Sequence, residues 1–93
     1  MNDAAMIRDV VIRNRLGLHA RASAQFVKTA GRFRSEITVE AGVHAVNGKS
    51  IMGLLLLAAA QGTTLRLKAV GPDAAVALDA LAALVEGLFG EAE

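Results

Sequence analysis

The stretch at residues 15–24, RLGLHARASA, places a histidine and an arginine two residues apart, directly after a glycine turn. The imidazole of His19 is a nucleophile, and the planar guanidinium of Arg21 can hold phosphate oxygens at two points. If His19 precedes a helix, main-chain N–H groups without intrahelical partners and the positive end of the helix dipole add a site for an anion. These residue types at this spacing are what a histidine that carries a phosphoryl group would need.

The same residues also fit a plainer structural role. In that interpretation His19 caps a helix or lies on the surface, and Arg21 stands nearby by chance. Spacing alone favours this structural role over the chemical one. The choice depends on the elements that position His19.

The spacing of apolar residues predicts seven such elements. In chain order they are a strand at 6–13, a helix at 20–30, strands at 35–41 and 44–46, a helix at 51–60, a strand at 63–70, and a helix after the turn at 71–73. The first helix is expected to bury Ala22, Phe26, Val27 and Ala30, and the last helix Leu78, Leu81, Leu84, Val85 and Leu88. His19 therefore falls just before the first helix.

Apolar and polar residues alternate along the strands at 35–41 and 63–70, which indicates one face in solvent and one face under helices. We therefore expect an α+β open-faced sandwich: a four-stranded antiparallel sheet with three helices on one face, in the order βαββαβα. A length of 93 residues fits a single domain, residues 1–93.

The amino-acid composition excludes several kinds of functional site. The chain has no cysteine, and its two histidines lack clustered carboxylates, so we expect no metal site and no cofactor. His44 is expected to be an exposed strand residue. A net charge of +1, with no Trp or Tyr, argues against nucleic-acid binding.

The distribution of charged residues suggests the class of partner, and the apolar runs suggest the cellular location. Residues 8–34 hold seven of the ten Lys and Arg, which favours an anionic group or an acidic protein partner. The N-terminus does not resemble a signal peptide, and the longest apolar run, residues 54–60, is too short to insert into a membrane. We expect a cytoplasmic protein.

Three stretches, GLHARASAQFVKTA, VNGKSIMGLL and QGTTL, together resemble the HPr family of histidine-containing phosphocarriers of the bacterial phosphotransferase system. The resemblance covers nearly the whole chain and implies a carrier that is not itself an enzyme. Such a carrier takes phosphoryl from enzyme I, which phosphoenolpyruvate has phosphorylated, and passes it to a IIA-type domain in sugar uptake or its regulation. It further implies that His19 is phosphorylated on the ring nitrogen nearer the main chain, and that Arg21 is the active-site arginine.

One position departs from the family pattern. The family has a proline where this chain has Ala22, followed here by Ser23. Proline would fix the backbone in the first helical turn, so alanine leaves a looser entry at a cost below ~1 kcal/mol. We expect the chemistry to survive, and Ser23 to be a half-buried serine that bonds to the backbone.

The stretch GKSIMGL assigns further roles. Ser50 is a natural N-cap of the second helix, and the resemblance implies that an HPr kinase/phosphorylase could also phosphorylate it. Leu54 and Leu57 are expected in the core. The residues that the resemblance assigns to partner binding are Ala20, Ala24, Lys28, Lys49, Ile51, Met52 and Leu55.

Two alternatives share these features. A carrier of a nitrogen-regulatory phosphotransfer branch would have the same residues, and only its cognate enzyme I would distinguish it. A purely regulatory binding protein, controlled at Ser50, would be expected to have lost His19. We expect a monomer in each case.

Overall fold

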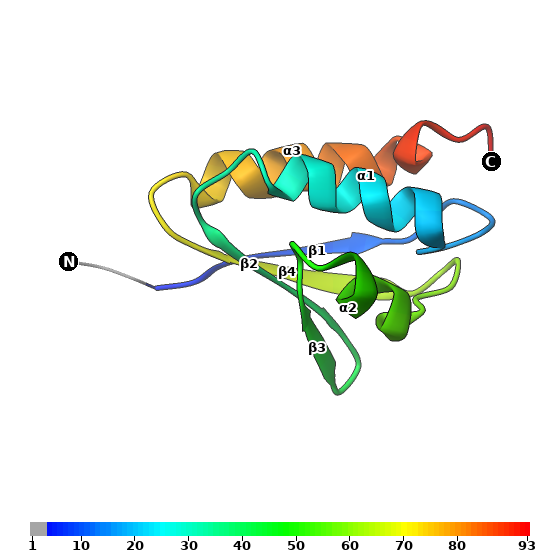
Figure 1. The fold of residues 1–93 in the computed structure, drawn as a ribbon, viewed down its shortest axis with the longest axis horizontal. Helices are drawn as coiled ribbons and strands as arrows, with labels where there is room; N and C mark the ends of the chain where they lie inside the picture. Colours follow the sequence, from blue (N-terminus) through cyan, green and yellow to red (C-terminus); the bar gives the residue numbers. More distant parts are fainter. Residues whose placement is uncertain (1–3) are drawn as a thin grey trace.

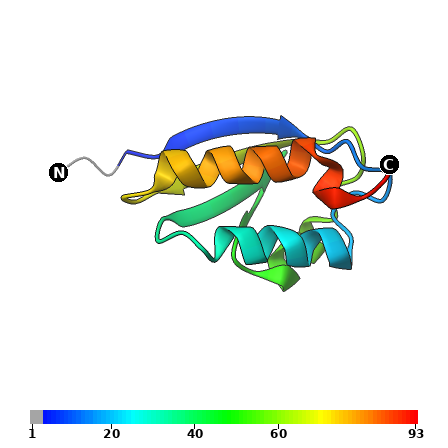
Figure 2. The same ribbon diagram turned by 90° about the horizontal axis from the view of Figure 1, so that it is seen from above.

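The computed structural model describes residues 4–93, and its strands and helices follow the expected order. The elements are β1 (Met6–Val11), α1 (Ala20–Ala30), β2 (Glu36–Ala41), β3 (His44–Asn47), α2 (Ile51–Leu57), β4 (Thr64–Val70) and α3 (Ala74–Glu86), then a short 3-10 helix η1 (Leu88–Gly90). The strands pair antiparallel in the order β1-β4-β2-β3 (Figure 1). Figure 2 shows α1 and α3 side by side over the sheet. A four-stranded antiparallel sheet with three helices confirms the expected fold class.

The two faces of the sheet differ as the alternation predicts. The buried strand residues are Val10, Ile37, Val39, Leu65, Leu67 and Ala69. On the other face, Lys68 pairs with Glu40 at 2.9 Å and Arg66 with Asp9 at 3.1 Å, between neighbouring strands. Exposed ion pairs of this kind add little stability. The buried face, packed against the helices, therefore provides most of the stability of the fold.

Helix α2 is shorter than the sequence indicates. It ends at Leu57, not at residue 60, because Ala58 takes the left-handed conformation with φ 51°. The carbonyl of the buried Ala59 then accepts the N–H of Leu18 at 2.9 Å. The run of alanines contains no helix-breaking residue, so only this contact with the loop before α1 reveals where the helix stops.

The end of α3 also differs from the expectation. The helix stops at Glu86, and Leu88 lies outside it in η1, only partly buried. Phe89 is the buried residue of this segment, at 3 % exposure. Leu78, Leu81 and Val85 are buried as expected, because they share the helix face that covers the sheet.

Candidate functional site

His19 is the N-cap of α1, with extended backbone at φ −78° and ψ −177°. Its carbonyl accepts the N–H of Ser23 in the first helical turn, and its Nδ1 accepts the main-chain N–H of Arg21 at 3.3 Å. Because Nδ1 acts as an acceptor, the ring proton is assigned to Nε2. The imidazole is 25 % exposed. Its Nδ1 lone pair therefore lies at the N-terminus of a helix, in a side chain that solvent can reach.

The loop before α1 holds His19 in this position. Gly17 has a φ of +64°, and a Cβ at this residue would lie 2.4 Å from the carbonyl oxygen of Ala59, so only glycine fits. Leu18 is buried, and its carbonyl accepts the hydroxyl of Ser23 at 3.2 Å. Ser23 is fully buried, whereas the sequence suggested a half-buried residue, because the loop folds back over the helix start. His19 is thus fixed from both sides.

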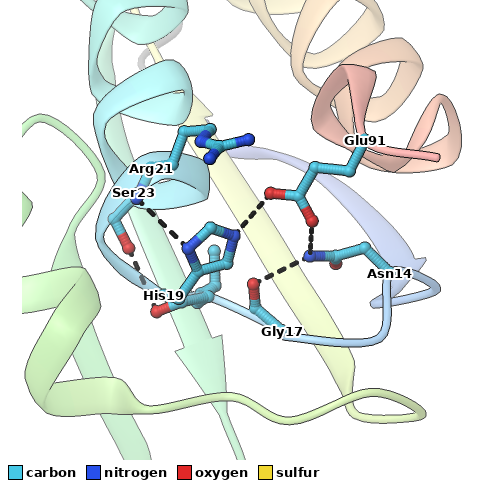
Figure 3. A network of polar contacts seen from close by, with 7 residues as sticks. Asn14, Gly17, His19, Arg21, Ser23 and Glu91 are labelled. Carbon is cyan, nitrogen blue, oxygen red and sulfur yellow. Dashed lines mark hydrogen bonds and ion pairs between the residues drawn. The ribbon is translucent and has the colours of Figure 1, made fainter. Parts of the chain in front are cut away.

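Arg21 lies in the first turn of α1 with an exposed side chain. Within residues 4–93 its guanidinium forms no hydrogen bond or ion pair, so its donors are available to a ligand. The main-chain N–H of Arg21 contacts the imidazole of His19, and Figure 3 shows both side chains at the start of α1. The structure therefore brings the two residues together as the sequence predicts.

The C-terminal segment brings a carboxylate to the same histidine. The Nε2–H of His19 donates to Oε2 of Glu91, while Oε1 of Glu91 accepts the side-chain amide of Asn14 at 3.0 Å (Figure 3). The Asn14 amide also donates to the carbonyl of Gly17 at 2.9 Å. The hydrogen bond from Asn14, followed by that from His19, lowers the pKa of the Glu91 carboxyl below its ordinary 4.5 despite the opposing effect of burial. Glu91 is therefore ionised at neutral pH.

Glu91 reaches His19 because the chain turns sharply after α3. Leu88, Phe89 and Gly90 have φ values of 61°, 53° and 79°, all in the left-handed region. This conformation costs of order 1 kcal/mol for each of the two non-glycine residues, and it persists only where packing maintains it. The buried side chain of Phe89 in the core supplies that packing.

Sequence reasoning missed Asn14 and Glu91. Glu91 lies 72 residues from His19, beyond the reach of any local pattern. Asn14 reads as an ordinary polar loop residue, although it is fully buried and its Oδ1 has no hydrogen-bond partner among the described residues. An acidic residue in a C-terminal tail is too common a feature to have identified Glu91.

The apolar residues expected beside the histidine are exposed. Ile51 and Met52, in the first turn of α2, are 43 % and 65 % exposed, and Leu55 is half-buried. A shallow groove next to His19 is lined by Leu16, Leu18, Leu55 and residues 58–60. Ala20 and Ala24 are exposed on α1. Leu54 is fully buried and Leu57 packs against the core, as expected.

The two lysines assigned to this surface lie in different surroundings. Lys28 is exposed in the last turn of α1, nine residues from His19, or about 14 Å along the helix axis. The ammonium of Lys49 donates to the carbonyl of Phe33 at 2.7 Å, in the loop after α1. Neither lysine lines the groove next to His19.

Ser50 is the N-cap of α2, as expected. Its Oγ accepts the N–H of Gly53 at 3.0 Å, and its backbone is extended. His44 is exposed at the start of β3. Among residues 4–93 no three His, Cys, Asp or Glu side chains gather where they could hold a metal ion, and no helix is long and apolar enough to cross a membrane.

Residues 6–87 match the protein family described as PTS HPr component phosphorylation site. The phosphocarrier protein HPr of Neisseria meningitidis serogroup A is 52 % identical over 86 residues, which cover 92 % of this chain and 97 % of that protein. The phosphocarrier protein NPr of Shewanella violacea is 45 % identical over 85 residues, covering 91 % of this chain and 93 % of the relative.

Solved structures agree with the sequence relatives. The crystal structure of HPr-C-His from Thermoanaerobacter tengcongensis superposes with a TM-score of 0.91 at 44 % identity, covering 95 % of this chain and 99 % of that chain. A crystal structure of an HPr dimer from the same organism superposes with a TM-score of 0.75 at 48 % identity, covering 88 % of this chain and 94 % of the other. Glu91 lies outside the residues that match the family.

Proposed function

The chain belongs to the HPr family of phosphocarrier proteins of the phosphotransferase system, and from this premise we propose that it accepts a phosphoryl group on His19 from phosphorylated enzyme I and passes it to a IIA-type domain. The observation that carries the proposal is the Nδ1 of His19, held at the N-terminus of α1 in the same helical turn as Arg21, whose guanidinium has no partner within residues 4–93. The protein is then a carrier that other enzymes load and unload, and it does not itself turn over a substrate.

The proposed step at His19 is a displacement at phosphorus. The Nδ1 lone pair forms the new bond to phosphorus, and the electron pair of the broken bond stays with the donor atom of enzyme I. As the phosphoryl group arrives, the main-chain N–H of Arg21 gives up its hydrogen bond to Nδ1. This N–H and others of the first turn then donate to the phosphoryl oxygens. The guanidinium of Arg21 can hold two of the oxygens. Because the His19 side chain is open to solvent, the bound phosphoryl group stays accessible to the next partner.

Docking of the partners is proposed at the surface next to His19. Ile51, Met52 and Leu55 supply an apolar centre, and methionine adapts to several partners. Ala20 and Ala24 extend the surface onto α1, while Lys28 and Lys49 are proposed to act at its periphery by steering acidic partners. A small surface of this kind suits transient complexes with successive partners.

The branch of the system is a separate proposal. We favour sugar uptake, with the nitrogen-regulatory branch as the second candidate because one relative is an NPr. Transfer rates from the two classes of enzyme I would decide between them. A cytoplasmic location and a monomeric state are also proposed, and the state can be measured by light scattering, since one solved relative is a dimer.

Ser50 is proposed as a regulatory phosphorylation site for an HPr kinase/phosphorylase. A phosphate there would stand next to the exposed Ile51 and Met52 at the docking surface. Its two negative charges would repel an acidic partner and interrupt the apolar contact. The fold would tolerate the modification, because the helix N-terminus favours negative charge.

The main test is incubation with enzyme I and phosphoenolpyruvate, followed by intact-mass measurement. We expect one added phosphate that is lost in mild acid and kept in base, as for a phosphohistidine. Omission of enzyme I is the control and should give no label. No label in the complete mixture, or a label stable in acid, would contradict the proposed function.

A further inference from the structure

The carboxylate of Glu91 accepts a hydrogen bond from Nε2 of His19, the ring nitrogen that the proposed transfer does not use. Nδ1 of His19 faces the start of α1, and Nε2–H on the other side of the ring donates to Glu91 (Figure 3). A carboxylate in this position holds an imidazole in one tautomer and one orientation, as in a nucleophile–base–orienter arrangement. Here it keeps the ring proton on Nε2, so that the Nδ1 lone pair, which accepts only the N–H of Arg21, can bond to phosphorus.

The side chain of Glu91 is itself held in place, so its contact with His19 differs from an incidental contact on the surface. Its second oxygen accepts the amide of the fully buried Asn14, and its side chain is only 10 % exposed. Phe89, two residues earlier, is anchored in the core. The neighbouring tail residue Glu93 offers a contrast, because it pairs with Arg15 at 3.3 Å through side chains that are 70 % and 66 % exposed.

Building on the proposed function, we propose that Glu91 is a positioning residue for phosphoryl acceptance: its carboxylate holds His19 with Nδ1 free and balances the positive charge that the ring gains on phosphorylation. When Nδ1 bonds to phosphorus, the proton stays on Nε2, so the ring carries one positive charge. The electron pair of the broken bond stays with the donor. The charge therefore develops in direct contact with an ionised carboxylate.

The carboxylate does not face the incoming phosphoryl group. Nδ1 and Nε2 lie on different sides of the imidazole, and the phosphoryl oxygens meet the N–H groups of α1 and the guanidinium of Arg21. Glu91 can thus stabilise the phosphorylated ring without competing for the same donors. Removal of its charge is expected to disfavour phosphoryl acceptance in both rate and equilibrium.

The experiment compares wild type with Glu91→Gln, Glu91→Ala and the matched tail control Glu93→Gln. Single-turnover acceptance from phosphorylated enzyme I should slow by about three- to tenfold in both Glu91 variants, and the phosphorylated fraction at equilibrium should fall by a similar factor. Glu91→Gln isolates the charge, since its amide oxygen can still accept Nε2–H. Glu93→Gln should match wild type in acceptance, and circular dichroism should show that all four proteins are folded at the temperature of the assay.

A second measurement needs no phosphotransfer. NMR of the unphosphorylated protein should show a hydrogen-bonded Nε2–H proton of His19 in wild type and Glu93→Gln, and lose it in Glu91→Ala. Acceptance by Glu91→Gln as fast as wild type, or faster, would overturn the charge-balancing role. Acceptance by Glu91→Ala as fast as wild type, or an unchanged Nε2–H signal in that variant, would overturn the positioning role. If wild type accepts no phosphoryl, the proposed function itself fails, which the wild-type reaction alone reveals.

Discussion

The starts of α1 and α2 share one geometry but differ in what the capping side chain can do. Each N-cap residue has extended backbone and a side chain that accepts a first-turn N–H. Ser50 Oγ makes this bond at 3.0 Å, whereas Nδ1 of His19 makes it at a longer 3.3 Å. The weaker bond at His19 leaves a nucleophilic lone pair that a phosphoryl group can take over, and the shorter bond at Ser50 supports the helix.

The surroundings strengthen this difference. His19 has the exposed Arg21 in the first turn of the helix that it caps, and an ionised carboxylate accepts the hydrogen bond of its other nitrogen. Ser50 is followed by the exposed Ile51 and Met52, which are residues suited to contact a partner. A helix N-terminus attracts anions wherever it occurs, so the neighbouring side chains decide whether it becomes a reactive site, a cap or a part of a docking surface.

The largest effect is expected when the reactive cap is removed. His19→Ala should abolish phosphoryl acceptance completely, because the other nucleophile in the first turn of α1, the hydroxyl of Ser23, is fully buried and bonded to the carbonyl of Leu18. The fold should survive, since alanine still permits the helix. The variant loses the cap bond, worth about 1 kcal/mol, and the hydrogen bond to Glu91. Intact mass and circular dichroism are the measurements, and acid-labile phosphate on this variant would contradict the assignment.

Charge at the second cap should have the next largest effect. Ser50→Asp should melt no earlier than wild type, because a carboxylate also caps a helix, yet accept phosphoryl more than about tenfold more slowly through repulsion at the docking surface. Ser50→Ala is the matched control: it should lose about 1 kcal/mol of stability and keep normal acceptance. If Ser50→Asp accepts phosphoryl as fast as wild type, the regulatory role of Ser50 is contradicted and only its role as a helix cap remains.

A smaller effect is expected at the guanidinium that distinguishes the start of α1. Arg21→Lys keeps the charge but loses the planar pair of donors, so transfer to the IIA partner should slow by about three- to tenfold. Stability should stay near that of wild type, since the side chain is exposed. The checks are a transfer assay and a thermal melt, and an unchanged transfer rate would show that guanidinium geometry is unimportant.

A third helix start, that of α3 with Asp73 as its N-cap residue, can be compared with those of α1 and α2. Here we expect the smallest effect, a dependence of stability on pH. Asp73 accepts the hydroxyl of Ser35 and the N–H groups of Arg34 and Ser35, and these bonds, that from the Ser35 hydroxyl first, lower its pKa from 3.8 to about 2. A lowered carboxyl pKa stabilises the fold above the unfolded value, and the stabilisation is lost as pH falls through the folded value.

Asp73→Asn should therefore melt earlier than wild type at pH 7, and the gap between the two melting temperatures should close as pH falls from about 4 to about 2. Thermal melts of both proteins at several pH values would test this. A gap that stays constant down to pH 2 would show that the ionised carboxylate does not link the start of α3 to the start of β2.

Local patterns in the sequence determined a large part of the structure. Helix α1 has the predicted bounds, and Ile37 and Val39 alternate with polar neighbours as a half-buried strand requires. His19 and Arg21 fall in one helical turn, and Ser50 caps α2. These features depend on residues only a few positions apart, whose backbone periodicity and hydrogen bonds the sequence displays directly.

Tertiary packing alone decided the rest. Helix α2 ends where Ala59 meets the loop at Leu18, and the last helix gives way to a left-handed turn because Phe89 enters the core. That turn carries Glu91 to a histidine 72 residues away. The physical reason is the same in each case: a contact between distant segments outweighs a local preference of about 1 kcal/mol, and no short stretch of sequence records which segments will meet.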